Sequence, residues 1–382
     1  MITESKGTVK VITGNAAAAW GARLSRPDVI AAYPITPQTT IVETLARWVD
    51  TGELKAHMIR VESEHSAMAA VMGASAAGAR TYTATSSQGL LYMAEMISWA
   101  AGARTPIVMS VVDRALGPPW NIWSEHTDAL MLRDSGWILF WAANNQEVLD
   151  SVIQAYKIAE HKEVILPAMV MHDGFILSHT TMPVEIPKQE LVDEFLPPYD
   201  PPHYVMNPKV SPPITFGNIA LPADYVKFRL SIEKAMKNAK KIIKKVAAEF
   251  KEFFGRWHGD LVSYYNTEGV DTIVIALGNV AEQVEATIDS SKELKKRAGV
   301  VKVRAFRPFP KEEIADIARK VSNIVVIDRD ISFGWGGILA GEVRATLHEF
   351  RVDTPVYGKI MGIGGDEILP EHIEKSLNEI LR

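Results

Sequence analysis

The sequence predicts an α/β fold made of two units, each a parallel β-sheet packed against helices. Short apolar, β-branched runs alternate with longer helical stretches from Val9 to about Thr180, a pattern typical of a parallel sheet with helices on both faces. The alternation resumes from Asp271 in what we expect to be a smaller unit. With 382 residues, 47% of them apolar, the chain is long enough for two hydrophobic cores.

In the first unit, four runs are expected to form strands: Val29–Ile30, Thr81–Thr85, Pro106–Val112 and Ile165–Met171. The segment Ser63–Gly78 is rich in Ala, Gly and Ser and predicts a helix that packs closely against its neighbours or against a bound flat molecule. Tryptophans are dense between Trp99 and Trp141, which indicates a large buried contact surface, either core or subunit interface.

Between the units, the segment Pro183–Pro222 holds 10 of the 21 prolines and is expected to form an arm without regular structure. A Lys-rich helix is predicted over Ser231–Phe254, where apolar residues recur at i, i+3 and i+4. The second unit predicts strands at Thr272–Ala276, Val300–Val303 and Ile324–Ile327, with helices up to Ala298, from Lys311 and after Gly337. The expected domains are residues 1–258, including the arm (183–222) and the Lys-rich helix, and residues 259–382.

Charge and composition argue against several classes of function for this protein. A net charge of -5 gives no basic field for a nucleic-acid partner. No run of about 18 apolar residues occurs, and Met1–Lys10 lacks an apolar core, so we expect neither a membrane span nor a signal peptide, and a cytoplasmic location. Without cysteine, any iron–sulfur cluster must sit on another chain. The 10 histidines form no HExxH motif and no tight His/Asp cluster, so no metal site is expected.

The first motif is Tyr33-Pro34-Ile35-Thr36-Pro37, directly after an apolar strand. Its two prolines fix the backbone around Thr36 at the carboxyl end of a strand, where open α/β sheets bind ligands. The hydroxyl of Thr36 is therefore a candidate for a substrate hydrogen bond. The alternative is that Thr36 only caps the following helix, with Pro37 as its first residue.

The second motif places Glu62, Glu64 and His65 between a strand and the small-residue helix. Side chains alternate along a strand, so at most one of the two carboxylates points into a given pocket. A carboxylate there could protonate or polarise a ring nitrogen. Alternatively, both are first-turn acids that favour the helix dipole.

The third and fourth motifs also follow strands. Thr85-Ser86-Ser87-Gln88-Gly89 is a small polar turn whose amide hydrogens could face a ligand at a helix N-terminus. Arg114, followed by the segment Ala115–Trp120 with two prolines, is suited to clamp a carboxylate. A structural salt bridge is the alternative for Arg114.

These four motifs, in this order, resemble the alpha subunits of 2-oxoacid:ferredoxin oxidoreductases. The resemblance covers nearly the whole chain and continues through Arg133–Trp137, Asn144–Glu147, Phe175–Thr180, Glu194–Pro198, Phe306–Pro310 and Ile331–Gly334. It implies a thiamin-diphosphate-binding fold with a pyrimidine-type domain and a smaller transketolase C-terminal-like domain. It also implies a subunit that is not catalytically complete alone.

By the same resemblance, Glu64 matches the carboxylate that bonds the aminopyrimidine ring of thiamin diphosphate, Arg114 the arginine that holds the substrate carboxylate, and Thr36 the hydroxyl that helps position it. Further cofactor contacts are expected from Pro34, Ile35, Ser87 and Gln88.

The family further implies beta, gamma and delta partner subunits, with Mg²⁺ and [4Fe–4S] clusters on the partners, coenzyme A as co-substrate and ferredoxin as electron carrier. The expected reaction is the reversible oxidative decarboxylation of pyruvate. Oxalate-using relatives carry arginine in place of Thr36, which argues against oxalate. Departures from the commonest pyruvate pattern at Gly117–Trp120 and Ser124–His126 leave a branched or aryl 2-oxoacid open. A non-catalytic scaffold is the alternative of another class.

Overall fold

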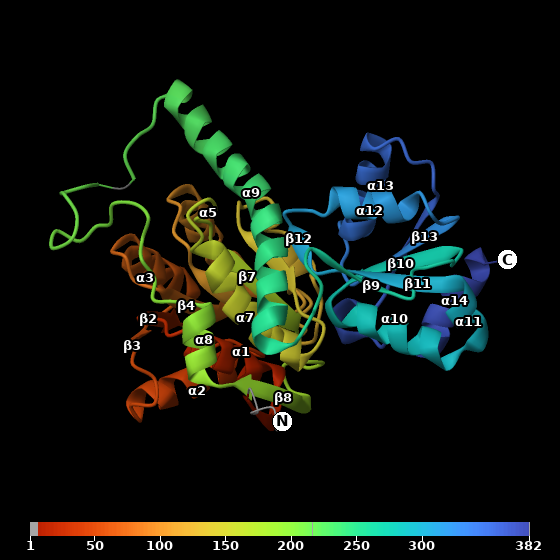
Figure 1. Ribbon diagram of the computed structural model, residues 1–382, viewed down its shortest axis with the longest axis horizontal. Helices are drawn as coiled ribbons and strands as arrows, with labels where there is room; N and C mark the ends of the chain where they lie inside the picture. Colours follow the sequence, from red (N-terminus) through yellow and green to blue (C-terminus); the bar gives the residue numbers. More distant parts are fainter. Residues whose placement is uncertain (1–6, 216, 382) are drawn as a thin grey trace.

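A computed structural model describes residues 7–215 and 217–381 (Figure 1). Residues 1–6, on which part of the signal-peptide expectation rests, lie outside the described residues. The strands form a seven-stranded sheet, a five-stranded sheet and a two-stranded ribbon. Across the described ranges, no helix combines the length and apolar character that a bilayer crossing requires.

The larger sheet has the order β12-β6-β7-β5-β4-β2-β3, and all its neighbouring strands are parallel except the edge strand β12. The predicted parallel sheet is therefore confirmed. Its strands are β2 (Val29–Ala32), β3 (His57–Arg60), β4 (Thr81–Thr85), β5 (Val108–Asp113), β6 (Ile138–Trp141), β7 (Ala168–Asp173) and β12 (Ala305–Arg307).

Helices cover both faces of this sheet because successive strand residues point to opposite sides. Ile30 and Val108 pack in one core with α1, α2 and α7, whereas Ala31 and Met109 pack in the other with α3 and α5. The helices are α1 (Gly14–Leu24), α2 (Thr39–Asp50), α3 (Glu64–Ala76), α4 (Ser87–Tyr92), α5 (Ala94–Gly102), α6 (Thr127–Leu130) and α7 (Asn145–Ala159).

The smaller sheet has the order β14-β13-β10-β11-β9, with only β9 antiparallel to its neighbour. Its strands are β9 (Val262–Tyr265), β10 (Thr272–Leu277), β11 (Ala298–Val303), β13 (Asn323–Asp328) and β14 (Val356–Ile360). The helices are α10 (Gly278–Ser290), α11 (Lys292–Arg297), α12 (Lys311–Ala318), α13 (Ile338–Glu349), the 3₁₀ turn Ile363–Gly365 and α14 (Pro370–Ile380). Each strand and helix predicted for the second unit is present.

The proline-rich segment is partly regular, contrary to the prediction. It contains most of β8 (Thr181–Pro187) and all of α8 (Gln189–Phe195). β8 pairs antiparallel with β1 (Gly7–Thr13) in a separate ribbon. Proline lacks a backbone N–H but is tolerated in a strand that has a neighbour on one side only. The described residues from 196 to 221 contain no helix or strand, as expected.

The Lys-rich helix α9 (Pro222–Phe254) begins at Pro222 rather than at Ser231. Ile232, Ile243 and Phe250 pack into the core, whereas every residue from 222 to 230 is exposed. The apolar spacing nevertheless begins in these first turns, since Tyr225, Phe228 and Ile232 line the same hollow. Figure 1 shows this end of α9 projecting from the body.

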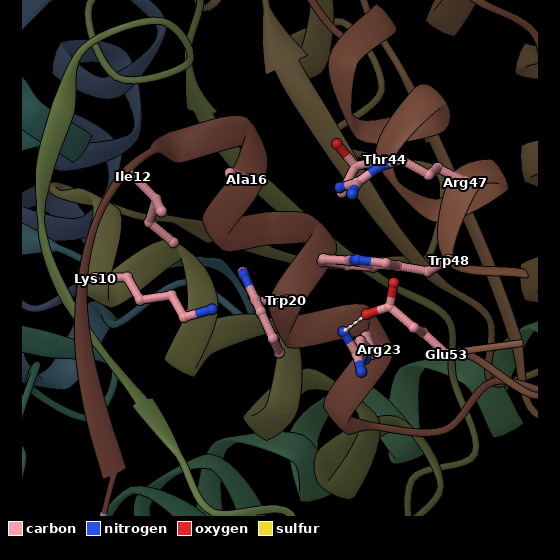
Figure 2. Close-up of a pocket in the computed structure, with 9 residues that line it drawn as sticks. All are labelled: Lys10, Ile12, Ala16, Trp20, Arg23, Thr44, Arg47, Trp48 and Glu53. Atoms are coloured by element: carbon pink, nitrogen blue, oxygen red, sulfur yellow. Dashed lines mark hydrogen bonds and ion pairs between the residues drawn. The ribbon is translucent and has the colours of Figure 1, made fainter. Parts of the chain in front are cut away.

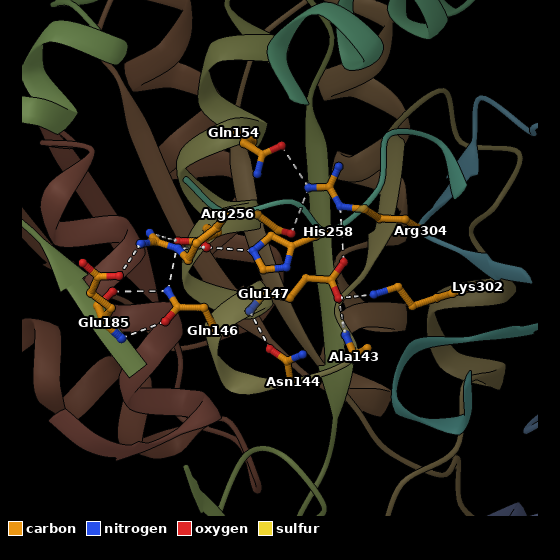
Figure 3. A network of polar contacts seen from close by, with 12 residues as sticks. Ala143, Asn144, Gln146, Glu147, Gln154, Glu185, Arg256, His258, Lys302 and Arg304 are labelled. Carbon is orange, nitrogen blue, oxygen red and sulfur yellow. Dashed lines mark hydrogen bonds and ion pairs between the residues drawn. The ribbon is translucent and has the colours of Figure 1, made fainter. Parts of the chain in front are cut away.

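A buried ionic network joins the two units (Figure 3). Glu147 of α7 accepts a 2.6 Å hydrogen bond from Lys302 of β11, and Arg304 Nε lies 3.3 Å from its other oxygen. Asp150, one turn further on, forms an ion pair with Arg256 at 2.7 Å. Burial alone would raise the pKa of Glu147, yet Lys302 and other nearby cations hold it below its ordinary value. Lys302 and Arg304 therefore fix α7 against the second unit, while Arg256 ties α7 to the end of the first.

Candidate functional site

The loop Tyr33–Pro37 follows β2 and leads into α2, as predicted. Gln38, not Thr36, occupies the N-cap position of α2, so the capping alternative for Thr36 is wrong. Gln38 Nε2 donates to the carbonyl of Ala84 at 2.7 Å, which ties the loop to β4. Thr36 and Pro34 are exposed and Ile35 is partly exposed, so their side chains are open to a ligand.

Glu64 is the first residue of α3 and is only 7% exposed. Ser63 caps the helix by accepting from Ser66 N at 3.2 Å, while Glu62 is exposed and bonds the Ser66 hydroxyl. Among the described residues, the Glu64 carboxylate forms no hydrogen bond and no ion pair within 4.0 Å, but its charge acts on Arg114 and favours the charged guanidinium. A nearly buried carboxylate without a partner is costly unless a ligand completes it.

The space around this carboxylate depends on Gly89, in the first turns of α4. A β-carbon on Gly89 would lie 2.5 Å from Glu64 Oε1 and 2.8 Å from Thr85 Oγ1. The Thr85 hydroxyl is itself buried and has no partner within the described chain. The absence of a side chain at position 89 therefore leaves room for two unpaired oxygen atoms.

Arg114 follows β5 directly and is 5% exposed. Its Nη1 donates to the carbonyl of Thr36 at 2.7 Å and its Nη2 to Gln88 Oε1 at 2.6 Å. Its Nε is buried with no partner in the described structure, and no carboxylate there pairs with Arg114, so the salt-bridge alternative is not what is found. Burial lowers the pKa of Arg114, and an arginine remains a cation under such shifts.

Three of the predicted site residues, Thr36, Gln88 and Arg114, are thus in direct contact. Ser87 forms hydrogen bonds of its own. Its amide donates to Asp128 at 2.9 Å, and its hydroxyl donates to the carbonyl of Ala115 at 2.6 Å. The turn amide expected to face a ligand is therefore already bonded within the chain.

Two family models match this chain. Residues 20–248 match the model described as pyruvate flavodoxin/ferredoxin oxidoreductase, thiamine diphosphate-binding, and residues 270–373 match pyruvate:ferredoxin oxidoreductase core domain II. The chain belongs to the pyruvate:ferredoxin oxidoreductase family. The first match alone covers more than half of the sequence.

Relatives of this oxidoreductase subunit match over almost their full length. Pyruvate synthase subunit PorA of Methanocaldococcus jannaschii is 50% identical, with 99% of this chain and 96% of that protein aligned. Ketoisovalerate oxidoreductase subunit VorA of Pyrococcus horikoshii is 48% identical, with 93% and 89% aligned. These two relatives carry different substrate names at nearly the same identity.

Solved structures confirm the fold. The 2-oxoglutarate:ferredoxin oxidoreductase of Magnetococcus marinus, with 2-oxoglutarate, coenzyme A and succinyl-CoA bound, superposes with a TM-score of 0.74 at 19% identity. The match covers 98% of this chain and 65% of that one. A split gene transketolase, in an inactive beta4 tetramer, gives a TM-score of 0.54 at 14% identity. The predicted thiamin-diphosphate-binding fold is correct.

Behind the site of this oxidoreductase chain lies a buried polar cluster that the sequence analysis missed. His126 Nε2 lies 2.7 Å from Asp173 Oδ1 and 4.0 Å from Asp113 Oδ2, so the three could surround a cation. One oxygen of each aspartate is bonded to a neighbour, Asp113 Oδ2 to Trp141 Nε1 at 2.8 Å and Asp173 Oδ1 to the Ser124 hydroxyl at 2.6 Å. Asp113 Oδ1 and Asp173 Oδ2 are buried with no hydrogen-bond partner among the described residues.

A cation of the protein also lies at this cluster, since Arg329 Nη1 is 3.4 Å from Asp173 Oδ1. Burial would raise the pKa of Asp173, but Arg329 and His126 hold it below its ordinary value. Burial and the neighbours Asp128 and Asp173 raise the pKa of Asp113 well above its usual range. The sequence did offer one sign of this cluster, because Asp113 and Asp173 are the last residues of the neighbouring strands β5 and β7.

The tryptophans of this region divide between core and surface. Trp137 and Trp141 are fully buried, whereas Trp120 is 82% exposed, and Trp99 and Trp123 are about half exposed. The core alternative is correct for Trp137 and Trp141, and the subunit-interface alternative stays a prediction for the other three. Trp120 lies in the loop that begins at Gly117, whose carbonyl accepts from Gln88 Nε2 at 3.4 Å.

A hollow of about 480 Å³ lies between β1, α1 and α2, away from the site residues described above (Figure 2). Arg23 lies over both Trp20 and Trp48, 4.8 Å from each ring centre, and Lys10 lies 4.8 Å from the centre of Trp20. Because the cations already cover these rings, the stack holds the three elements together.

Proposed function

We propose that this chain is the alpha subunit of a multisubunit 2-oxoacid:ferredoxin oxidoreductase whose substrate is pyruvate. Pyruvate and coenzyme A would give acetyl-CoA and carbon dioxide, with the electrons passing to ferredoxin, and the reaction would be reversible. The observation that carries the proposal is the contact of Arg114 with Thr36 and Gln88, a buried cation with an unpaired Nε at the ends of parallel strands. Identity to a pyruvate synthase subunit supports the choice of substrate.

Glu64 would bind the pyrimidine ring of thiamin diphosphate. Its carboxylate is nearly buried, lacks a partner in the described chain and lies in the space left by Gly89, which fits a ring nitrogen. Pro34, Ile35 and Gln88 would line the same cavity, and Ser87 would support it through its internal bonds. When bound, thiamin diphosphate supplies the nucleophile that attacks the 2-oxo carbon and the electron sink for decarboxylation.

Arg114 would bind the substrate carboxylate through the second N–H of Nη1 and Nη2, because Thr36 and Gln88 accept only one hydrogen from each of these nitrogens. The exposed Thr36 hydroxyl would donate a second hydrogen bond to the substrate. Holding the carboxylate in place directs the 2-oxo carbon toward the cofactor and lowers the entropy cost of the reaction.

Partner chains would supply what this one lacks. It contains no cysteine, so the [4Fe–4S] clusters would sit on the beta and delta subunits. The beta subunit would hold Mg²⁺ and the cofactor diphosphate, and a gamma subunit would contribute to coenzyme A binding. In this chain, residues 1–258 would form the thiamin-binding domain and residues 259–382 the transketolase C-terminal-like domain. The cytoplasmic location stays a prediction.

A branched substrate is the second candidate, favoured by the 48% identity to a ketoisovalerate oxidoreductase subunit. The loop at Gly117–Trp120 rests on Gln88 and so borders the Arg114 contact, where it could shape the space for a larger side chain. An aryl 2-oxoacid would use the same space. A non-catalytic scaffold would require loss of the Glu64, Arg114 and Thr36 side chains, and all three are present.

The test is to purify the chain anaerobically with its native partners and to measure coenzyme A-dependent reduction of a low-potential viologen dye. Pyruvate, 2-ketoisovalerate and phenylglyoxylate are compared in parallel. We expect the highest kcat/KM with pyruvate. Preference for a bulkier acid would support the second candidate, and no reduction with any of the three would overturn the enzymatic proposal.

A further inference from the structure

Asp128 is a fully buried carboxylate that joins two segments of the proposed site. Its Oδ2 accepts from the amide of Ser87 at 2.9 Å and from the amide of Arg114 at 3.1 Å, while Oδ1 accepts from the amide of Ala129 at 2.8 Å. One side chain in α6 therefore fixes both the start of α4 and the residue that follows β5. A carboxylate that accepts several backbone amides makes strong, charge-assisted hydrogen bonds.

The two segments held by Asp128 are the ones whose side chains meet. Gln88 follows Ser87, and its Oε1 accepts from Arg114 Nη2 at 2.6 Å. Asp128 thus sets the backbone at each end of the Arg114–Gln88 contact. Without it, two buried amides in separate segments would lose their acceptor, and both segments would shift to find another.

The second unit braces the segment that carries Asp128. The amide of His126 donates to the carbonyl of Arg329 at 2.9 Å, and the amide of Gly365 donates to the carbonyl of Ser124 at 2.9 Å. Asn121 Nδ2 adds a 2.8 Å bond to the carbonyl of Gly364. Loops that follow β13 and β14 therefore hold the chain just before α6, so the smaller unit reaches Arg114 through Asp128.

We propose that Asp128 is a positioning residue that sets the direction of the Arg114 guanidinium and couples it to the second unit. The proposal rests on the proposed function, because it assigns the substrate carboxylate to Arg114. Asp128 itself is buried behind the two amides and does not touch the substrate.

The test compares four variants in the assembled complex: Asp128→Ala, Asp128→Asn, Arg114→Ala and the double variant Asp128→Ala/Arg114→Ala. The exposed acid Asp134, in the same stretch of chain, gives the matched control Asp134→Ala. For each, KM and kcat with pyruvate, KM for coenzyme A and the affinity for thiamin diphosphate are measured. Amide hydrogen exchange is followed in the peptides around Ser87 and Arg114.

We expect Asp128→Ala to raise KM for pyruvate about 20-fold or more, with KM for coenzyme A unchanged. Asp128→Asn keeps one oxygen acceptor and should recover most of the loss. Because Asp128 acts through Arg114, the double variant should be no worse than Arg114→Ala alone. A purely structural residue would instead change all constants together and add to the effect of Arg114→Ala.

Hydrogen exchange separates this inference from the proposed function. Faster exchange at both peptides in Asp128→Ala, but not in Asp134→Ala, is the expected result. Unchanged exchange, or an unchanged KM in an active complex, would overturn the role of Asp128. An inactive wild-type complex would count against the proposed function, while the exchange comparison would still decide whether Asp128 holds the two segments.

Discussion

Glu64 and Gly89 are so close that a β-carbon on residue 89 would lie 2.5 Å from the Glu64 carboxylate. Gly89 lies within helix α4 and its φ is not positive, so alanine fits its backbone and would favour the helix by about 1 kcal/mol. Any loss of function on adding a methyl group must therefore come from displacement of Glu64 or of Thr85, whose Oγ1 would lie 2.8 Å from the added carbon.

Gly89→Ala should lower kcat about 10-fold or more, because proton transfer depends on placement of the carboxylate. Steady-state kinetics of the assembled complex checks this. Gly73→Ala is the matched control, since a β-carbon on this helical glycine of α3 meets nothing within 4 Å. Equal activity of the two variants would contradict the role of the Glu64–Gly89 contact.

Glu64→Gln should lower turnover about 100-fold or more while the complex still assembles, because the amide has the same shape but cannot exchange a proton with a ring nitrogen. Activity and gel filtration are measured on the same preparation. The nearby exposed Glu62 offers Glu62→Gln as the control. Normal turnover by Glu64→Gln would remove Glu64 from the cofactor site.

Arg114→Ala should raise KM for the 2-oxoacid about 10- to 100-fold, the range expected for a charge-assisted hydrogen bond. Arg114→Lys should recover only part of this, because lysine cannot bond Thr36, Gln88 and a substrate with the geometry of a guanidinium. Initial rates over a range of pyruvate concentrations give the answer. An unchanged KM in Arg114→Ala would show that the carboxylate binds elsewhere.

Lys302→Met should lower the free energy of unfolding by about 3 to 5 kcal/mol, because it leaves the buried carboxylate of Glu147 short of a partner. Lys295 pairs with Asp289 at the surface, so Lys295→Met should change the free energy of unfolding far less than Lys302→Met does. Chemical denaturation of both variants measures the difference. Similar losses in the two would mean that the buried pair adds nothing beyond a surface pair.

Stability should fall as the pH rises from about 4 to about 8, because Asp328 has a raised pKa in the folded chain. Burial, then the neighbouring Asp330, raises the pKa of Asp328 to about 8, against an ordinary value of 3.8. The folded chain therefore binds the extra proton, and its stabilising effect, complete below the ordinary pKa, is lost as the pH passes about 8.

Thermal melting at a series of pH values tests this contribution. Asp328→Asn removes the titrating group, so its Tm should vary less with pH than that of the wild type. The exposed Asp353 gives the control Asp353→Asn, which should follow the wild type. Parallel curves for all three proteins would show that Asp328 does not titrate in this range.

The sequence predicted the parts of the fold that depend on local pattern. Strands with continuous apolar runs and the polar turns after them were placed correctly, and this placement puts Thr36, Gln88 and Arg114 at the same edge of the sheet. Their contact follows because the carboxyl ends of parallel strands β2, β4 and β5 lie side by side. Their roles remain proposals.

Features that depend on distant partners could not be predicted. Pro183 and Pro187 suggested irregular structure, but β1, more than 170 positions earlier, supplies a pairing strand. The start of α9 is a different case, because Tyr225, Phe228 and Ile232 already stand at helical spacing and Pro222 suits the first turn of a helix, so this error did not come from a distant partner. The sequence analysis did not identify Asp128. Its carboxylate accepts from the amides of Ser87 and Arg114, and such contacts between distant segments produce no recognisable spacing in the sequence.

The short strand β12 bears on how this protein could be divided. After β11 the chain leaves the smaller sheet, pairs Ala305 with Phe140 at the edge of the larger one, and continues into α12. A gene split between the two family matches would therefore leave β6 with an open edge, the kind of surface that promotes aggregation. The two halves are modules in sequence but not in folding, so they would have to be synthesised together to remain soluble.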